Sequence, residues 1–211
     1  MKQIAVISFL ILIFNPIKIL SQESSINFKT EPRNNWGLNF NYNESGFGVA
    51  GMYSFPVSKS TDIQANILVS GVSDPREFKE FDPFGNSWIM NKVNRVYMVP
   101  LSIGVQHYLF ADDLEGNIKP LVTAGISPAL IVTTPYDKSY FNAFSYAHAS
   151  FAFGGFIGTG LEFRHNKNLG LSFNVKYYYL PVLGNEVKSI TTNTIDDVGG
   201  LQLSFGVNFL K

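Results

Sequence analysis

Cysteine is absent from the 211-residue chain. Without thiols the protein can form neither a disulfide scaffold nor a zinc site that depends on thiolate ligands. Charged residues are also scarce, at 15% of the sequence against about 25% in an ordinary soluble domain. The 16 basic and 16 acidic residues balance and form no basic run, which argues against nucleic acid as a partner. The sequence therefore lacks the charged coat of a water-soluble protein.

Long apolar runs are missing after the first 21 residues. Residues 1–21 combine Lys2 with an apolar stretch from Ile4 to Phe14, and Ser21 is a small residue that could precede a cleavage point. The stretch is shorter than the roughly 20 residues of a membrane-spanning helix. The pattern therefore predicts a secretory signal peptide, with an uncleaved anchor as the alternative. We expect a signal peptide at 1–21, an N-terminal periplasmic segment at 22–35 and one barrel domain at 36–211.

The sequence is rich in glycine and aromatic residues that alternate along the chain, with 18 Gly, 19 Phe and 10 Tyr. In the first alternating run, Trp36, Leu38, Phe40 and Tyr42 are separated by glycine and asparagine. A period of two residues predicts strands with two different faces. Most runs reach the roughly 9 to 11 residues of a tilted membrane strand, whereas ordinary strands have about 5 or 6. The eight runs cover residues 36–43, 47–55, 62–70, 97–109, 119–132, 150–164, 171–179 and 201–209.

The two faces of these runs differ in a way that indicates which one contacts lipid. One face carries large apolar side chains, and the other carries Gly, Ser, Asn and Gln with few charges. Such a polar face would be a poor water-facing exterior, but it suits a narrow lumen packed with hydrogen-bonding groups. We therefore expect the apolar face outside. A water-soluble, lipocalin-like ligand-binding barrel, with its apolar face inside, is the alternative.

The connections between runs alternate in length. Short turns are expected at 56–60, 111–116 and 165–168, whereas the stretches 73–92 and 133–148 are long, as is 181–197. This asymmetry is typical of bacterial outer-membrane barrels, whose short turns face the periplasm. The sequence thus predicts an all-β fold, an eight-stranded antiparallel up-and-down transmembrane β-barrel of the outer-membrane type.

Two prolines interrupt the predicted strands. Pro100 and Pro128 fall inside the fourth and fifth runs. Proline cannot donate a hydrogen bond to a strand ladder, so we expect bulges or barrel kinks at both positions.

Three stretches resemble the PorT-like outer-membrane β-barrel family. They are VPLSIGVQHYLF at 99–110, KPLVTAGISP at 119–128 and the glycine-rich FGGFIGTGLE at 153–162. The last strand also resembles a barrel-assembly signal, although its aromatic residue, Phe209, is third from the end. The resemblance implies a location in the cell outer membrane, a secretion-accessory role and recognition by the barrel-assembly machinery.

Four charged residues fall on the expected lumen face, and they are Lys119, Glu162, Arg164 and Lys176. We expect them to form a polar cluster, because charges inside a narrow barrel are stable only when they are paired. The structural interpretation is a plug of salt bridges, and a proton or ion path is the alternative.

The first long loop, at 73–92, carries the aromatic residues Phe78, Phe81, Phe84 and Trp88. Exposed aromatics of this kind are candidates for binding a protein partner or a glycan. They would otherwise pack over the barrel mouth or rest in the outer headgroup layer. The expected partners are therefore membrane lipid and lipopolysaccharide, the barrel-assembly machinery and a protein at the long loops.

His148, Ser150 and Glu162 have the order and spacing of outer-membrane lipid A deacylases. In such a hydrolase the serine attacks an acyl ester, the histidine accepts its proton and the glutamate orients the histidine. However, a continuous strand from His148 to Glu162 would span roughly 46 Å, which is too far for contact. We therefore predict no enzymatic activity, no cofactor and no metal site. The expected role is structural, interactive or accessory to secretion, and the hydrolase is the alternative.

Overall fold

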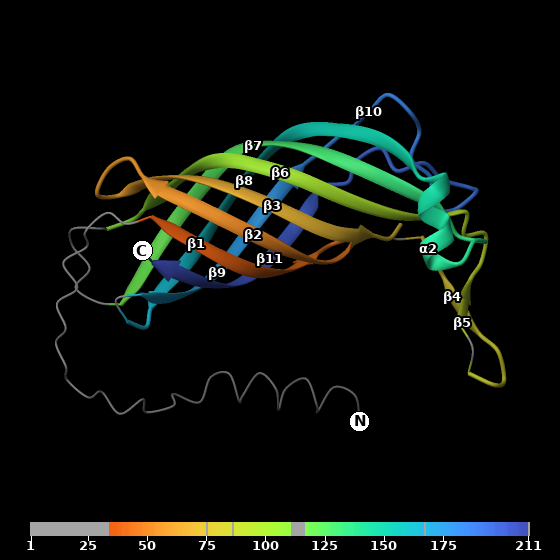
Figure 1. Cartoon of the computed structure of the whole chain (residues 1–211), viewed down its shortest axis with the longest axis horizontal. Coiled ribbons are helices and arrows are strands. Elements are labelled where there is room, and N and C mark those ends of the chain that lie inside the picture. Colours follow the sequence, from red (N-terminus) through yellow and green to blue (C-terminus); the bar gives the residue numbers. More distant parts are fainter. Residues whose placement is uncertain (1–33, 75, 86, 111–116, 167, 211) are drawn as a thin grey trace.

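The computed structural model describes residues 34–74, 76–85, 87–110, 117–166 and 168–210. The predicted signal peptide lies outside these residues, as does nearly all of the predicted periplasmic segment. The described chain forms one barrel with loops at one end (Figure 1). The barrel strands are β1 (Asn35–Asn43), β2 (Gly46–Pro56), β3 (Thr61–Val72), β6 (Asn94–Tyr108), β7 (Ile118–Pro135), β8 (His148–Arg164), β9 (Leu169–Tyr179) and β11 (Gly200–Leu210).

The barrel closes because its last strand pairs with its first. Each barrel strand is antiparallel to the next, and β11 pairs with β1 from Asn35↔Leu210 to Asn43↔Gln202. Closure leaves no free edge, so every strand has a hydrogen-bonding neighbour on both sides. The predicted eight-stranded up-and-down barrel is confirmed.

Alternation in the sequence sets the two faces of every strand. In β1, the apolar side chain of Phe40 is 71% exposed, whereas the neighbouring Asn41 is 3% exposed. The same pattern continues around the ring, and large exposed side chains such as Val49 and Ile67 form an apolar outer belt. The apolar faces therefore point outward, as predicted. A lipocalin-like barrel would need the opposite arrangement.

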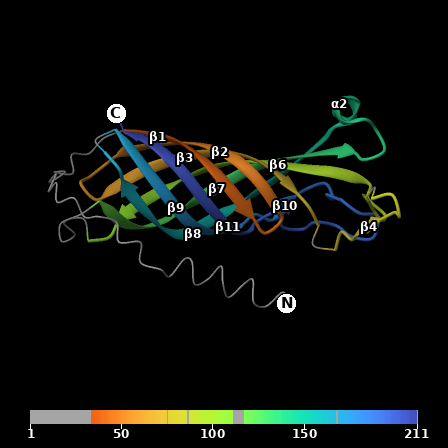
Figure 2. The same cartoon turned by 90° about the horizontal axis from the view of Figure 1, so that it is seen from below.

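The strands differ in length, and this difference gives the barrel two unlike ends. At the turn end, β2 leads to β3, β6 to β7 and β8 to β9. At the opposite loop end, the adjacent strands β6, β7 and β8 extend well beyond β1 and form a tall wall (Figures 1 and 2).

Small elements lie at the loop end. They are β4 (Lys79–Phe81), β5 (Ser87–Ile89), α2 (Tyr140–Ala143), the 3-10 turn η1 (Phe144–Tyr146) and β10 (Val182–Leu183). None of the helices in the described part of the chain has the length and apolar character needed to cross a membrane.

The two prolines do not produce bulges. A bulge adds a residue to one strand and shifts the register beyond it. On both sides of Pro100 the pairs Ile67↔Leu101 and Ser70↔Met98 keep one register, and Pro128 pairs with Phe153 inside a continuous ladder. The predicted bulges are therefore wrong, whereas the alternative of barrel kinks at the two prolines stays a prediction. Next to Pro100 the β3–β6 ladder is interrupted instead, because proline has no N–H to donate.

The barrel interior has two halves of different chemistry. Toward the turn end it holds amides, hydroxyls and charged groups, as predicted. Toward the loop end it is mainly apolar, although Ser70 and Ser150 are also buried there, so the expectation of a polar lumen is wrong for most of this half. The buried barrel residues of the apolar half are Ala50, Leu68, Val72, Val96, Met98, Ala129, Ile131, Ala152, Phe156 and Tyr178.

A segment of the chain itself fills the apolar half. Leu180, Val187, Ile195 and Val198 come from the connection between β9 and β11 and pack against the apolar barrel residues. We call this connection, residues 180–199, the mouth plug. Its apolar side chains explain why the surrounding barrel residues are apolar, since each set removes the other from water.

Candidate functional site

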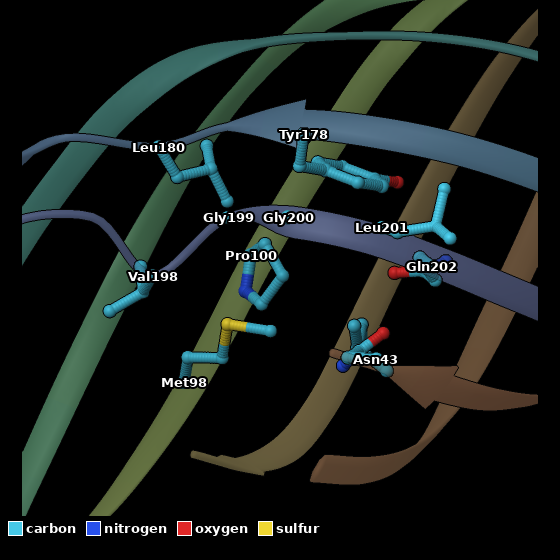
Figure 3. Close-up of a pocket in the computed structure, with 11 residues that line it drawn as sticks. Asn43, Met98, Pro100, Tyr178, Leu180, Val198, Gly199, Gly200, Leu201 and Gln202 are labelled. Carbon is cyan, nitrogen blue, oxygen red and sulfur yellow. The ribbon is translucent and has the colours of Figure 1, made fainter. Parts of the chain in front are cut away.

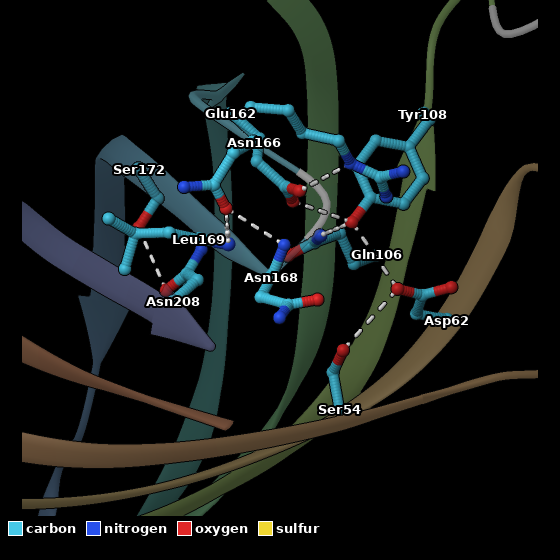
Figure 4. Close-up of polar contacts among 11 residues, drawn as sticks. Ser54, Asp62, Gln106, Tyr108, Glu162, Asn166, Asn168, Leu169, Ser172 and Asn208 are labelled. Atoms are coloured by element: carbon cyan, nitrogen blue, oxygen red, sulfur yellow. Dashed lines mark hydrogen bonds and ion pairs between the residues drawn. The ribbon is translucent and has the colours of Figure 1, made fainter. Parts of the chain in front are cut away.

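A polar cluster lies in the lumen near the turn end. Its centre is the hydroxyl of Tyr108 on β6, which lies 2.8 Å from Oε2 of Glu162 on β8 and 3.3 Å from Oδ2 of Asp62 on β3 (Figure 4). Nε2 of Gln106 donates to the same hydroxyl at 2.9 Å. A phenol has one hydrogen, so Tyr108 can donate to only one of the two carboxylates at a time.

Basic side chains balance these carboxylates. Nε of Arg164 lies 3.3 Å from Oε1 of Glu162, and both side chains are nearly buried. Nζ of Lys119 lies 5.7 Å from the ring centroid of Tyr108. The structure thus brings together three of the four predicted lumen residues. It adds Asp62 and Tyr108, which also fall on inward positions of the sequence pattern but had not been singled out.

Lys176 lies apart from this cluster. It is four residues along β9 from Ser172, the residue that pairs with Glu162, and four strand residues span about 13 Å. Its ammonium lies 3.4 Å from Oε1 of Gln64 and 5.3 Å from the ring centroid of Phe156. Lys176 is only 3% exposed, yet within the described residues no carboxylate forms an ion pair with it. It therefore sits at the boundary between the polar and apolar halves.

The four predicted loop aromatics belong to or flank a hairpin that projects from the loop end. Strands β4 and β5 pair through Glu80↔Trp88, and Gly85 adopts a positive φ of 86° near the tip (Figure 1). The exposed fractions are 75% for Phe78, 69% for Phe81, 89% for Phe84 and 45% for Trp88. These aromatics therefore do not seal the barrel mouth.

Polar contacts hold the mouth plug against the first long loop. Nζ of Lys92 lies 2.6 Å from Oε2 of Glu77, and the Ser189 hydroxyl donates to the other oxygen of Glu77. Nδ2 of Asn193 donates to Oδ2 of Asp74 at 2.9 Å. We call these five residues the latch. Sequence analysis missed the latch, because its members lie far apart in the chain and follow no periodic pattern.

The latch carboxylates have shifted acidities. Burial by itself would raise the pKa of Glu77, but the hydrogen bonds from Lys92 and Ser189 outweigh burial and lower it. Burial would likewise raise the pKa of Asp74, but the hydrogen bonds from Asn193 and from the Arg76 backbone outweigh it and lower the pKa. Both carboxylates are therefore held in the charged form that the latch requires.

The second long loop is fastened by an arginine. The Arg95 guanidinium lies 4.7 Å from the ring centroid of Tyr136 and 5.9 Å from that of Tyr140. It also donates to the carbonyl oxygens of Pro135 and Lys138 at 3.0 and 3.3 Å. Stacking and hydrogen bonding together fix the loop that carries α2 beside the tall wall.

The residues of the hydrolase alternative do not meet. His148 and Glu162 lie near opposite ends of the single strand β8, and Ser150 is buried opposite Ile131. A strand cannot fold back on itself, so the glutamate cannot orient the histidine. Nor do the described residues place three or more histidine, aspartate or glutamate side chains where they could together hold a metal ion.

A small cavity lies beneath the mouth plug (Figure 3). Its volume is about 10 Å³, close to the minimum that one water molecule needs. Met98 and Pro100 line it from the wall, and Val198 lines it from the plug. Asn43 and Gln202 contribute polar groups, and Oδ1 of Asn43 is buried with no hydrogen-bond partner among the described residues.

The comparisons with known proteins identify the fold. No family model matches the sequence, and no curated protein matches it. The structure is similar to a major outer membrane protein from Thermus thermophilus, with a TM-score of 0.57 and 12% identity over 85% of this chain and 99% of that one.

Two further solved structures are similar at the same 12% identity. Neisserial surface protein A gives a TM-score of 0.53 over 84% of this chain and 94% of that one. The N-terminal β-barrel domain of Pseudomonas aeruginosa OprF gives 0.50 over 86% and 100%. At such low sequence identity, the similarity shows the fold alone. The PorT-like resemblance therefore stays a prediction. The chain folds as the small eight-stranded barrels of bacterial outer membranes do.

Proposed function

We propose that this protein is a non-enzymatic barrel of the cell outer membrane that presents a protein-binding surface at its loop end. The observation that carries the proposal is the contrast between a filled lumen and an exposed aromatic hairpin. Interior side chains such as Glu162 and Ile131 are buried, whereas Phe81 and Phe84 are freely accessible on the β4–β5 hairpin. The surface available to a protein partner therefore lies outside the barrel.

The outer surface of the barrel supports the membrane location. Large apolar side chains, among them Leu38, Val49 and Phe205, are exposed around the ring, and water contact with such a belt would be unfavourable. Membrane lipid is the natural solvent for this belt, and the headgroups of lipopolysaccharide would adjoin the loop end. The predicted signal peptide and the aromatic-ended last strand agree with export and with recognition by the barrel-assembly machinery.

The interior supports a role other than conduction. An eight-stranded barrel is just wide enough for side chains to fill. Here Glu162 and Ile131 are almost inaccessible in the two halves, and the mouth plug covers the loop end. A proton or ion path would have to cross the apolar half, which offers few polar groups to carry it.

The hairpin supports binding of a protein. Aromatic side chains on a rigid element are the usual anchors of protein interfaces, because they bury a large area at little cost in conformational entropy. The β4–β5 pairing and the latch fix the position of the hairpin base. An accessory role in secretion is the narrower form of this proposal and rests on the PorT-like resemblance.

Site-specific photo-crosslinking on intact cells tests the proposal. A benzophenone amino acid would replace Phe84 at the hairpin, and in a matched control it would replace the exposed Lys59 at the turn end. We expect a protein adduct from position 84 that position 59 does not give. Membrane fractionation and a heat-dependent gel shift would verify that both variants are folded in the outer membrane. A folded position-84 variant without an adduct would contradict the proposal.

A further inference from the structure

The apolar half of the lumen forms a cup, and side chains from a loop fill this cup. Its wall consists of barrel side chains such as Leu68, Met98 and Ile131, and its contents are the side chains of the mouth plug. The turn-end half shows that this barrel can fill its lumen with hydrogen-bonding groups from its own strands. An apolar cup filled by a loop is thus a distinct feature of the loop end.

The mouth plug is joined to the barrel more loosely than the strands are to each other. Two-residue strand β10 pairs with β8, the isolated bridge Lys92↔Ile190 joins the plug to the first long loop, and the bridge Pro181↔Asp197 lies within the plug itself. Gly184 within the plug and Gly200 at the start of β11 adopt positive φ angles of 90° and 108°, a backbone conformation that glycine reaches without a steric penalty. Between them the plug is held by apolar packing, by the polar latch and by hydrogen bonds from the backbone N–H groups of Val93 and Asn94 to the Ser189 carbonyl.

A buried cation lies at the floor of the cup. The ammonium of Lys176 faces the ring of Phe156, which stacks at 5.1 Å on Tyr178, a residue that lines the small cavity. Gln64 is its hydrogen-bond partner, and no described carboxylate pairs with it. A buried charge without a counter-ion is costly, so this position favours an anionic ligand.

We propose that the loop-end half of the lumen binds a long-chain carboxylic acid, with the mouth plug acting as its lid. The acyl tail would take the place of the plug side chains in the cup, and the carboxylate would pair with the Lys176 ammonium. Leu180, Val187, Ile195 and Val198 together carry about as many side-chain carbons as a long acyl chain of roughly 14 carbons. The tail would therefore replace the packing that the plug gives up.

The charge at the floor of the cup and the width of the barrel determine which ligand fits. The cation at the floor attracts a carboxylate and repels a cationic amphiphile. The bore of an eight-stranded barrel holds one small ligand, which excludes a two-tailed phospholipid. This inference goes beyond the proposed surface role and does not depend on the β4–β5 hairpin, so the two can fail separately.

A reversible lock on the plug is the first test. The substitutions Lys92→Cys and Ile190→Cys place thiols on directly opposed residues of an antiparallel bridge, a geometry that suits a disulfide. Because the chain has no cysteine of its own, no other disulfide can form within one molecule. The reduced form of the same double variant is the matched control for the oxidised form, because both lack the Lys92–Glu77 pair of the latch, and the wild type controls for the effect of the reductant.

The probe is palmitic acid with a diazirine near its tail end, added to the full barrel in nanodiscs of zwitterionic phospholipid. Photolysis and peptide mapping would locate the label. In the wild type and the reduced variant we expect labelling of inward Met98 and Ile131, falling about tenfold or more when the lock is oxidised. Labelling of outward Val49 and Val207 by probe in the bilayer should not change. Absence of inward labelling in the wild type, or inward labelling that the lock leaves unchanged, would overturn the proposal.

The head-group contact is tested by comparing the acid with its methyl ester. In Lys176→Met the acid should need about tenfold more probe for the same inward labelling, because a charge-assisted hydrogen bond is lost. The ester should respond equally in both proteins, and Lys176→Arg should retain the preference for the acid. A heat-dependent gel shift would report folding. If Lys176→Met does not fold, the wild type alone decides, because equal labelling by acid and ester would rule out the Lys176 contact.

Discussion

The Lys92 ammonium lies 2.6 Å from Oε2 of Glu77, and both side chains are almost fully buried. This pair joins the two ends of the first long loop, and the Ser189 hydroxyl connects it to the mouth plug. Loops separated by about a hundred residues are thus fastened at one point. The closure of the barrel mouth depends on this contact as well as on apolar packing.

Removing Glu77 should loosen the mouth plug. Glu77→Ala leaves a buried ammonium without its partner, and breaking a buried pair costs roughly 3–5 kcal/mol. Amide hydrogen exchange at Ile195, whose N–H donates to the Val187 carbonyl within the plug, should accelerate accordingly. Glu186→Ala is the matched control, because Glu186 and Lys188 form an exposed pair that contributes at most about 1 kcal/mol. Equal exchange in the two variants would show that the latch does not hold the plug.

The latch should weaken in acid. Glu77 and Asp74 have lowered pKa values in the folded protein, so their stabilisation is complete above the ordinary values of 4.5 and 3.8. It is lost as the pH falls through the lowered values. Protease cleavage within the plug should therefore increase below about pH 4. Glu77→Gln should make cleavage less dependent on pH over this range, and an unchanged profile in that variant would contradict the assignment.

An arginine on the outward face of the barrel should be more destabilising the closer it lies to the middle of the membrane. Val175 lies near the middle of β9, where Val175→Arg should destabilise the barrel by about 2–4 kcal/mol. Ile118, at the turn end of β7, also faces outward, and Ile118→Arg should cost only about 0–1 kcal/mol. Urea titrations of folding into lipid vesicles measure both. A neutral Val175→Arg would mean that β9 does not face lipid at mid-depth.

Tyr108→Phe should destabilise the polar cluster. The substitution keeps the ring but removes the hydroxyl that lies between Asp62 and Glu162, and it leaves buried polar groups with fewer partners. The expected cost is about 1–3 kcal/mol in the same urea titration. Tyr53→Phe, on the outward face of β2, is the control and should change stability little. A cluster that tolerates Tyr108→Phe without loss would not depend on its central hydroxyl.

Ser150→Ala should leave the lipid A of the host unchanged. Ser150 is buried on β8, and Glu162 is near the other end of the same strand, so this glutamate cannot orient a serine–histidine pair formed by His148 and Ser150. Mass spectrometry of lipid A from cells with the wild type, the variant and no protein makes the comparison. Loss of an acyl chain that depends on Ser150 would restore the hydrolase alternative.

The strands and their faces were predictable because alternation is a local property. Side chains of neighbouring residues point to opposite faces of any strand, so Phe40 and Asn41 are distinguished without knowledge of their partners. The few charges on the polar face decided which face turned inward. These two observations were sufficient for the closed barrel and its outer belt.

The chemistry of the lumen was only partly predictable. Leu68, Met98 and Ile131 occupy inward positions, and their apolar character has a reason only once the mouth plug is seen to pack against them. Lys176 and Glu162 share the inward face, but the β8–β9 register places them at different heights in the barrel. Sharing a face does not imply contact, since height along the axis depends on strand pairing.

The sequence by itself determined a closed membrane-type barrel with apolar faces outward. Residue spacing and side-chain polarity decide locally, along each strand, which side chains share a face. Only the tertiary structure decided what fills the lumen and what closes its mouth. The plug, the latch and the isolated position of Lys176 depend on contacts between residues far apart in the chain. Such contacts follow from register and loop path, and the period of a single strand contains no information about either.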